Sequence, residues 1–374
     1  MKTNRLYIPI LALALAAGFT SCDDFLDREP MSTVDPEVYF TQVSQLESYA
    51  NQLYENILPS HGNWSYGIFG EDSGTDNQTG ATANNRFAEG LWKVPNKDDD
   101  NWKFEWIYRC NFFLQNVLEK YGTKEDGSEN TIMGDLASIK HYIGEIYFLR
   151  AYEYFKRYQK YGDFPIITEP LADDMEILRE SNKRMPRTEV ARFILDDLKK
   201  AYDFLSAKEM ATTRINKDAA LLLRSRVALF EGTWLKSFEG TAFVPNGEGW
   251  PGASKDYNKD YQFKSGSIDK EINYFLEQAI ADAETISEAY KNDLAENKGL
   301  QQSVNDPANP YYDMFAQEDL SGVREVLLWR QYGRGLVTHN VNVAANRGNY
   351  MNGVTRAFVN NFLMDDGTPV YTHG

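Results

Sequence analysis

Apolar residues recur at intervals of three and four along separate stretches of this sequence, and that period constrains the fold more than any other feature. Such spacing gathers apolar side chains on one face of an α-helix. Gly162, with Pro165 just beyond it, indicates a helix C-terminus, and Asn216 is a residue that commonly caps a helix N-terminus. The expected helices cover about residues 36–57, 102–121, 136–161, 190–205, 217–234 and 268–290.

Long stretches without this period separate the helices. Residues 59–100 and 238–266 are rich in Gly, Asn and aromatic residues, and structureless stretches of such length are usually either binding loops or disordered. Beyond Asn297 the sequence indicates loops and short strands, with Arg324–Tyr332 the best strand candidate. The predicted fold class is therefore mainly α: a degenerate tetratricopeptide-type scaffold of helical hairpins, with long loop insertions and a few short strands.

The N-terminal segment has the features of an export signal. Lys2 and Arg5 precede an apolar run, Tyr7–Phe19, that is long enough for a secretory signal and too short to span a bilayer. Small residues lead up to Cys22, as in a bacterial lipobox, where the cysteine is lipidated and becomes the first mature residue. An ordinary secretory signal is the alternative. We expect a signal peptide at 1–21, a lipidated tether at 22–35 and a single helical domain at 36–374.

Composition argues against several classes of partner and cofactor. The formal net charge of −16 disfavours nucleic acid as a ligand. If Cys22 is lipidated, Cys110 is the remaining thiol, and its position on an apolar stripe predicts a buried, inert side chain. The four histidines lie far apart in the sequence, so we expect neither a metal site nor another cofactor.

Five stretches, occurring in order, resemble the SusD/RagB-like family of outer-membrane nutrient-binding lipoproteins. They are CDDFLDREP, WKFEWIYRCNFFLQNV, GEIYFLRAYEYFKRYQKYGDFPII, PRTEVARFILDDLKKAYDFL and RINKDAALLLRSRVALFEGTW, and they cover most of residues 22–237. Family members are usually longer and contribute further helices from a C-terminal half. The resemblance therefore implies that the C-terminal part of the domain is missing from this chain.

The resemblance implies a function as well as a fold. The protein would be a cell-surface lipoprotein, held in the outer membrane by its lipid alone, that binds an oligo- or polysaccharide. It would deliver that cargo to a SusC-like TonB-dependent transporter and would not be an enzyme. Capture of peptides or glycoproteins and a role as a protein-interaction scaffold are alternatives. A surface glycoside hydrolase would need two carboxylates flanking the scissile bond, and no motif isolates such a pair, so no catalytic residue is assigned.

Glycan binding calls for particular residue types. An aromatic ring can cover the apolar face of a pyranose while Asp, Asn or Arg side chains bond its hydroxyl rim. The resemblance assigns such a role to the region of the 59–100 loop, and aromatic residues also gather in a second cluster nearer the C-terminus. For Trp64 and Trp92, pinning the loop to the scaffold is an equal alternative, whereas core packing is expected for Trp329. The candidate glycan-binding residues are Trp64, Asp72, Asp76, Asn77, Arg86, Trp92, Trp250 and Tyr332.

Overall fold

The computed structural model of this protein describes residues 39–59, 72–80, 89–90, 102–207, 212–299, 303, 305–333, 338–339 and 353–372. Its long elements are all helices, which confirms the predicted mainly α class. They are α3 (Val43–Ile57), α4 (Glu105–Tyr121), α5 (Leu136–Tyr161), α7 (Arg187–Phe204), α8 (Lys217–Ser237) and α9 (Ile268–Tyr290). The short elements are β1 (Gln78–Thr79), α6 (Met175–Ser181), η3 (Pro251–Ser254), α10 (Pro310–Ala316), β2 (Gly353–Val354), α12 (Arg356–Asn360) and η4 (Val370–Thr372).

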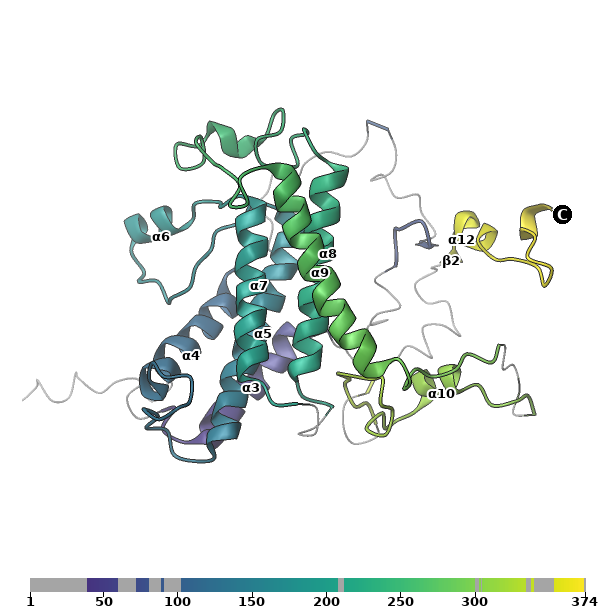
Figure 1. Cartoon of the computed structure of the whole chain (residues 1–374), viewed down its shortest axis with the longest axis horizontal. Helices are drawn as coiled ribbons and strands as arrows, with labels where there is room; N and C mark the ends of the chain where they lie inside the picture. The colour runs from purple at the N-terminus through teal and green to yellow at the C-terminus, as the bar shows by residue number, and fades with distance from the viewer. Residues whose placement is uncertain are drawn as a thin grey trace, which may run out of the picture.

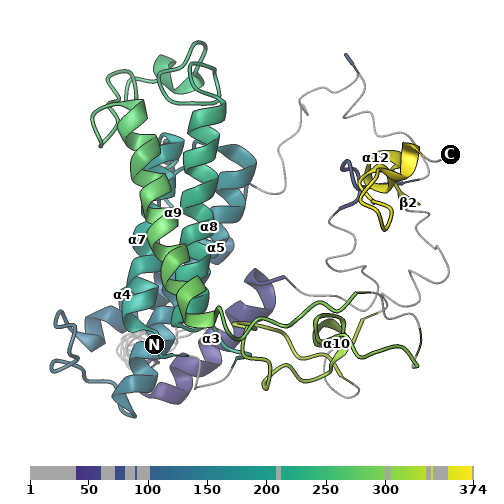
Figure 2. The ribbon, with the colours of Figure 1, turned by 45° about the vertical axis from the view of Figure 1, so that its right-hand side comes forward.

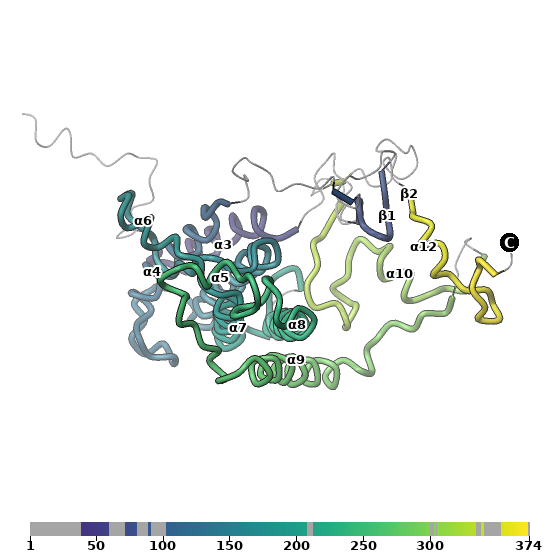
Figure 3. Tube along the Cα trace, turned by 90° about the horizontal axis from the view of Figure 1, so that it is seen from above, coloured from purple at the N-terminus to yellow at the C-terminus, as the bar shows by residue number. Residues whose placement is uncertain are grey.

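The long helices pack against one another in series. Helix α5 contacts α3, α4 and α7, helix α7 in turn contacts α8, and α8 contacts α9. Figures 1 and 2 show α5, α7, α8 and α9 running side by side, and in Figure 3 α9 lies at the edge of this stack. Helix pairs that contact only their neighbours are the architecture of an α-solenoid.

Helix α5 forms the centre of the core because it is surrounded on several faces. Its buried residues run from Ile139 to Tyr158 and include both apolar and charged side chains. A helix that is buried on more than one face needs apolar residues beyond a single stripe, which α5 has. Cys110 of α4 packs beside it, fully buried, and burial raises the pKa of its thiol, as expected for an inert cysteine.

Local signals set the start of α8 and the end of α5 where the sequence predicted them, whereas α3 begins at Val43, later than the expected start near residue 36. The side chain of Asn216 accepts a hydrogen bond from the backbone N–H of Ala219 at 3.0 Å, so it caps α8. Gly162 ends α5 with a φ of 67°, a left-handed conformation that favours glycine. Among the described residues, no helix combines the length and the apolar character that crossing a bilayer requires.

The predicted strand at 324–332 is wrong. Residues 324–331 have no strand structure and instead pack as an irregular chain against the N-terminal end of α8. Leu327 is buried beside Ala219 and Leu221. Its carbonyl oxygen accepts a hydrogen bond from the Asn216 side chain at 2.6 Å. The capping residue Asn216 thus supplies the hydrogen bond that a neighbouring strand would supply to this carbonyl group in a sheet.

Among the described residues, the only paired strands are β1 and β2. They are antiparallel, with Gln78 opposite Val354 and Thr79 opposite Gly353. Figure 2 shows β2 and α12 standing apart from the stacked helices. Two segments far apart in the sequence are therefore joined outside the helical core.

Candidate functional site

A cavity of about 720 Å³ lies where α3, α5, α8 and the segment 327–331 meet. We call it the junction cavity. One region that was expected to bind a ligand, the 59–100 loop, starts at its rim with Pro59. Of the second aromatic cluster, Trp329 lines the cavity and Tyr332 follows the lining residue Gln331, whereas Trp250 lies elsewhere. The lining residues are Asn51, Tyr54, Glu55, Leu58, Pro59, Phe148, Tyr152, Thr213, Leu223, Leu328, Trp329, Arg330 and Gln331.

Aromatic side chains from three separate elements form the walls of the junction cavity. Phe148 and Tyr152 are one helical turn apart on α5, and their rings stack with centroids 6.4 Å apart. Tyr54 comes from α3, and Trp329 comes from the irregular segment beyond α9. Aromatic surfaces that face a common space from different directions can hold a flat, partly apolar ligand between them.

The ring of Tyr54 is fixed by buried hydrogen bonds. Its hydroxyl donates to Oε1 of Glu145 at 2.6 Å and accepts from the backbone N–H of Ile215 at 2.8 Å. Burial, together with the nearby Glu145 carboxylate, raises the pKa of Tyr54 well above its usual value. Glu145 is in turn held by Arg214, whose Nη2 donates to it at 2.6 Å. The tyrosine therefore stays protonated and correctly oriented before any ligand arrives.

Trp329 is fixed in a similar way. Its backbone N–H donates to the carbonyl oxygen of Thr212 at 3.1 Å, and its indole N–H donates to the Thr212 hydroxyl at 2.8 Å. The indole stays half-buried, so part of the ring still faces the cavity. Because both donors are satisfied, a ligand would meet the apolar ring and not an unpaired N–H.

The rim of the junction cavity is polar. Exposed Glu55 and Gln331 and half-buried Arg330 supply a carboxylate, an amide and a guanidinium. Asn51 completes the rim, and its Oδ1 accepts a hydrogen bond from Nη1 of Arg214 at 2.8 Å. This set contains both donors and acceptors, which is what the hydroxyl groups of a sugar need.

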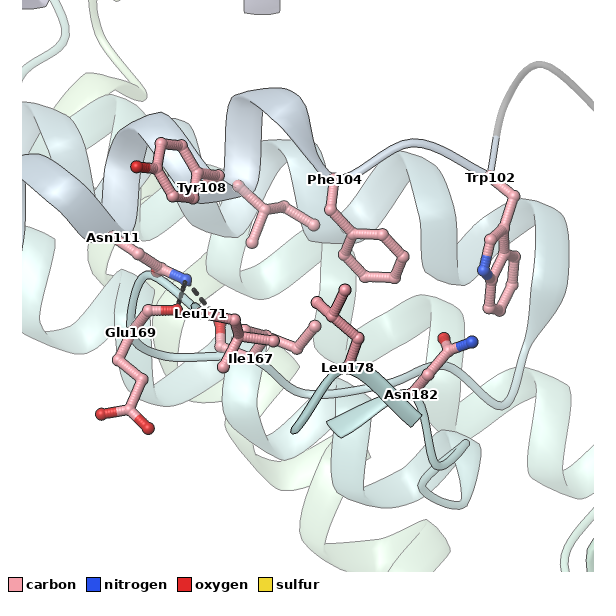
Figure 4. A pocket seen from close by; sticks show the side chains of 10 residues that line it. Trp102, Phe104, Tyr108, Asn111, Ile167, Glu169, Leu171, Leu178 and Asn182 are labelled. Atoms are coloured by element: carbon pink, nitrogen blue, oxygen red, sulfur yellow. Dashed lines mark hydrogen bonds between the residues drawn. The ribbon is translucent and has the colours of Figure 1, made fainter. Parts of the chain in front are cut away.

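A second cavity, of about 330 Å³, lies between α4 and α6, and we call it the α4–α6 cavity. Figure 4 shows Trp102, Phe104 and Tyr108 along one side, facing Leu171 and Leu178 across the space. The remaining lining residues are Ile107, Asn111, Ile167, Glu169 and Asn182.

The α4–α6 cavity offers fewer polar partners than the junction cavity. The amide nitrogen of Asn111 donates to the carbonyl oxygens of Ile167 and Glu169, at 2.9 and 3.3 Å (Figure 4). The Oδ1 of Asn111 accepts from Nη1 of Arg150 at 2.8 Å. Asn111 is thus occupied by the scaffold, and the polar groups that remain in the lining are the side chains of Glu169 and Asn182, the Tyr108 hydroxyl and the Trp102 indole N–H. This cavity suits an apolar group better than a hydroxyl-rich one.

Several predicted site residues fall outside the described part of the chain. These are Trp64, Arg86 and Trp92, together with the lipidation candidate Cys22. Their roles stay predictions.

Three further predicted residues lie together in a turn near β1. Asp72 and Asp76 are exposed, and the backbone carbonyl oxygens of Asp76 and Asn77 accept hydrogen bonds from Thr355. None of the three lines either of the two cavities above. A ligand role for these residues stays a prediction that requires a surface of its own around β1 and β2.

Trp250 and Tyr332 have different surroundings. Trp250 is 4% exposed, and its indole N–H donates to Oδ2 of Asp163 at 2.8 Å, so the ring anchors the 238–266 loop and offers little surface for stacking. Tyr332 is half-buried, with its ring 5.3 Å from that of His339. It follows Gln331 at the rim of the junction cavity, which is compatible with its predicted role.

Sequence reasoning missed most of the residues that line the junction cavity. Tyr54 and Tyr152 lie on helices and follow the apolar period closely enough to pass as core residues. One available signal was the pair Phe148 and Tyr152, since α5 carries aromatic residues beyond its main apolar stripe. Within the described residues, no group of three or more His, Cys, Asp or Glu side chains is placed to hold a metal ion.

Comparisons with known proteins agree with this architecture. SusD-like protein P25 of Formosa agariphila is 26% identical over 234 residues, which span 57% of this chain and 41% of that protein. SusD-like protein P2 of the same organism is 25% identical over 258 residues, which span 66% of this chain and 47% of that protein. The chain thus spans less than half the length of these two relatives.

A solved structure shares the fold at low sequence identity. The crystal structure of a SusD-like carbohydrate-binding protein from Bacteroides fragilis superposes with a TM-score of 0.57 at 15% identity, covering 90% of this chain and 56% of that one. The SusD-like family model described as "Starch-binding associating with outer membrane" matches residues 24–229, more than half of the chain. This chain therefore belongs to the SusD-like family.

Proposed function

We propose that this protein binds an oligo- or polysaccharide in the junction cavity, at the cell surface, and delivers it to a partner SusC-like TonB-dependent transporter. The observation that carries the proposal is the arrangement of Tyr54, Tyr152 and Trp329 around one space with a polar rim. Membership of a family described as starch-binding and associated with the outer membrane supports it. In the same proposal, lipid on Cys22 holds the chain at the membrane.

The expected strength of binding follows from the rings. Stacking one ring on a pyranose removes about 80 Å² of apolar surface from water, worth roughly 2 kcal/mol. Two or three such contacts, less the cost of association, correspond to micromolar to millimolar dissociation constants. Weak binding of this kind suits a protein that must release its cargo to a transporter.

The lining of the junction cavity favours binding over hydrolysis. A glycoside hydrolase generally needs two carboxylates about 5–9 Å apart across the scissile bond. Glu55 is the single carboxylate among the described residues that line this cavity. Arg330 and Gln331 complete a rim that can hold hydroxyl groups but supplies no second acid.

Native affinity electrophoresis through gels that contain a panel of neutral polysaccharides tests glycan binding. We expect one or more polymers to retard the protein relative to a non-binding reference protein. Retardation by none of the polymers, together with competition by peptides in a separate binding assay, would favour the alternative of peptide or glycoprotein capture. Co-purification of the transporter with the tagged chain from membranes tests the proposed partner.

A further inference from the structure

A third cavity, of about 630 Å³, lies at one end of the helical stack, and we call it the tip pocket. Its walls come from the C-terminal ends of α5 and α8, the start of α7, and the 238–266 loop with η3. Figure 1 shows this loop crossing the upper end of α8 and α9. The tip pocket shares no lining residue with the junction cavity.

The tip pocket concentrates positive charge in an acidic protein. Among the described residues, four cationic side chains line it, Lys160, Arg184, Arg187 and Lys255, with Asp163 as the lining carboxylate. Arg187 also forms a buried ion pair with Glu231, so the excess positive charge comes mainly from the other three cations. The whole chain carries a formal net charge of −16, so the positive charge in the tip pocket is opposite in sign to the net charge of the chain. A concave surface with an excess of one charge raises the local concentration of ligands of the opposite charge.

Both oxygens of Asp163, the carboxylate that lines the tip pocket, already accept hydrogen bonds from the scaffold. Oδ1 of Asp163 accepts the backbone N–H of Arg187 at 2.8 Å, and Oδ2 accepts the indole N–H of Trp250 at 2.8 Å. Burial raises the pKa of Asp163, although its hydrogen bonds and the nearby guanidinium groups of Arg187 and Arg184 act in the opposite direction. Asp163 is therefore a structural group that fixes the loop over the pocket.

Arg187 is 4% exposed and is held rigidly at the base of the tip pocket, with its guanidinium 4.3 Å from the ring centroid of Trp234. Its Nε and Nη2 donate to Oε2 of Glu231 at 3.0 and 2.8 Å, and Nη2 also donates to the hydroxyl of Tyr158. No hydrogen-bond acceptor within the described residues contacts its Nη1, which lies 3.6 Å from the Cβ position that a side chain at Gly162 would occupy. Glu231 compensates the charge of Arg187, so this residue offers a fixed Nη1 donor to a ligand and not an additional unpaired cation.

Arg184 and Lys255 are exposed, and neither forms an ion pair with a carboxylate in the described part of the chain. The guanidinium of Arg184 lies over the ring of Trp102, 4.6 Å from its centroid, which restricts its motion without consuming its charge. Both cations can therefore bind a ligand without first breaking a salt bridge.

Exposed rings lie next to these cations. Phe243 is 61% exposed and Tyr257 is 41% exposed, and Trp234 lies 6.5 Å from Phe243 between ring centroids. Rings beside cations match a ligand that combines an apolar face with a negative group. A neutral sugar would leave the cations unused, and an inorganic anion would leave the rings unused.

We propose that the tip pocket binds an acidic saccharide, its sugar ring against Phe243 and Tyr257 and its carboxylate or sulfate group on Arg184, Arg187 and Lys255. The site is separate from the junction cavity, so this inference does not depend on neutral glycan binding there. A carboxylate and a sulfate group would both present an anion to these cations, and matched pairs of probes distinguish the two groups.

The test is titration calorimetry of the full chain with two matched pairs of probes. Oligogalacturonate is compared with its neutral methyl ester, and dextran sulfate is compared with dextran. We expect at least one acidic probe to bind, with affinity falling as salt rises, and its neutral counterpart to bind at least tenfold more weakly at this site. The pair that shows the difference identifies the anionic group.

Matched variants locate the binding. The double substitution Arg184→Gln and Lys255→Gln removes two cations from the pocket, and each removed cation should weaken acidic binding about tenfold or more. Arg226→Gln with Lys270→Gln makes the same change in net charge on exposed positions of α8 and α9 and should leave binding unchanged. Thermal melting of both variants confirms that they remain folded.

Three results would overturn the inference. The first is that neither acidic probe binds more tightly than its neutral counterpart. The second is that the Arg184/Lys255 variant binds as the unaltered chain does, and the third is that the control variant loses affinity equally, since binding would then follow net charge alone. Absence of acidic binding in the unaltered chain, with neutral glycan binding intact, would refute this site and leave the proposed function standing.

Discussion

The buried ion pair between Arg150 of α5 and Asp197 of α7 gives the sharpest stability prediction. Arg150 donates from Nε and Nη2 to the two carboxylate oxygens of Asp197 at 2.7 and 2.8 Å. Its Nη1 donates to Asn111 of α4, and the side chains of Arg150 and Asp197 are 4% and 0% exposed. One guanidinium therefore links three helices at the centre of the core.

Arg150→Met keeps most of the side-chain volume and removes the charge. Asp197 is then a buried carboxylate without its cation, and loss of one partner from a buried pair typically costs about 3–5 kcal/mol. Asn111 loses a donor as well, which adds roughly 1 kcal/mol. We expect the free energy of unfolding to fall by about 4–6 kcal/mol, a large share of the total for a domain.

The double variant Arg150→Met with Asp197→Leu separates charge from packing. A buried pair replaced by apolar residues of similar size is often close to neutral, so the double variant should be more stable than Arg150→Met alone. Urea unfolding followed by far-UV circular dichroism measures the stability of both variants. Arg226→Met, at an exposed position of α8, is the control, and its free energy of unfolding should lie within about 0.5 kcal/mol of that of the unaltered chain. If Arg150→Met costs less than about 1 kcal/mol, or if the two substitutions are additive, the ion pair does not stabilise the core in this way.

Two other predictions concern packing and pH. Gly144→Ala on α5 should destabilise the fold by roughly 1–3 kcal/mol, because the new Cβ would lie 2.9 Å from the backbone nitrogen of Leu205. Gly232→Ala should cost less, since its Cβ would meet mainly the side chain of Leu276, and equal melting temperatures for the two would contradict this reasoning. Burial alone would raise the pKa of Glu271, but hydrogen bonds from Arg192 and Ser265 outweigh it and lower the pKa. Its stabilising contribution is therefore present above the unfolded pKa of about 4.3 and lost as pH falls through the lower folded value. Glu271→Gln should have a lower urea midpoint than the unaltered chain at pH 7, and the two midpoints should lie closer together at pH 3. A difference in midpoint that stays the same at both pH values would refute the stabilising role of the Glu271 carboxylate.

Much of the helical scaffold could be predicted because its determinants are local. The spacing of apolar residues and the capping residues can both be read from each segment alone. Helices α5 and α9 begin and end where that pattern predicts. The same approach gave a wrong strand prediction for the segment 324–332. Apolar residues can also alternate along an irregular chain when one side of that chain packs on the ends of helices. Leu327 is buried against α8 while its neighbours are more exposed, although residues 324–331 form no strand.

The junction cavity could not be predicted, because its walls come from distant parts of the chain. Tyr54, Tyr152 and Trp329 meet only after α3, α5 and α8 have packed, and each resembles a core residue in its own segment. Trp250 shows the opposite case: it lies in a loop, yet it is 4% exposed and its indole N–H donates to the carboxylate of Asp163. Loop position alone therefore does not distinguish an exposed platform from an anchor.

The most direct test of the central claim is the affinity of Tyr152→Ala for a neutral oligosaccharide, chosen from a polymer that retards the unaltered chain in gels. Tyr108→Ala is the control, since Tyr108 is 47% exposed and lines the α4–α6 cavity. If the glycan stacks in the junction cavity, calorimetry should show Tyr152→Ala weakening binding by about 2 kcal/mol, roughly thirtyfold, and Tyr108→Ala leaving it unchanged. Unchanged affinity in a folded Tyr152→Ala, or a loss confined to Tyr108→Ala, would contradict the account and place the glycan elsewhere.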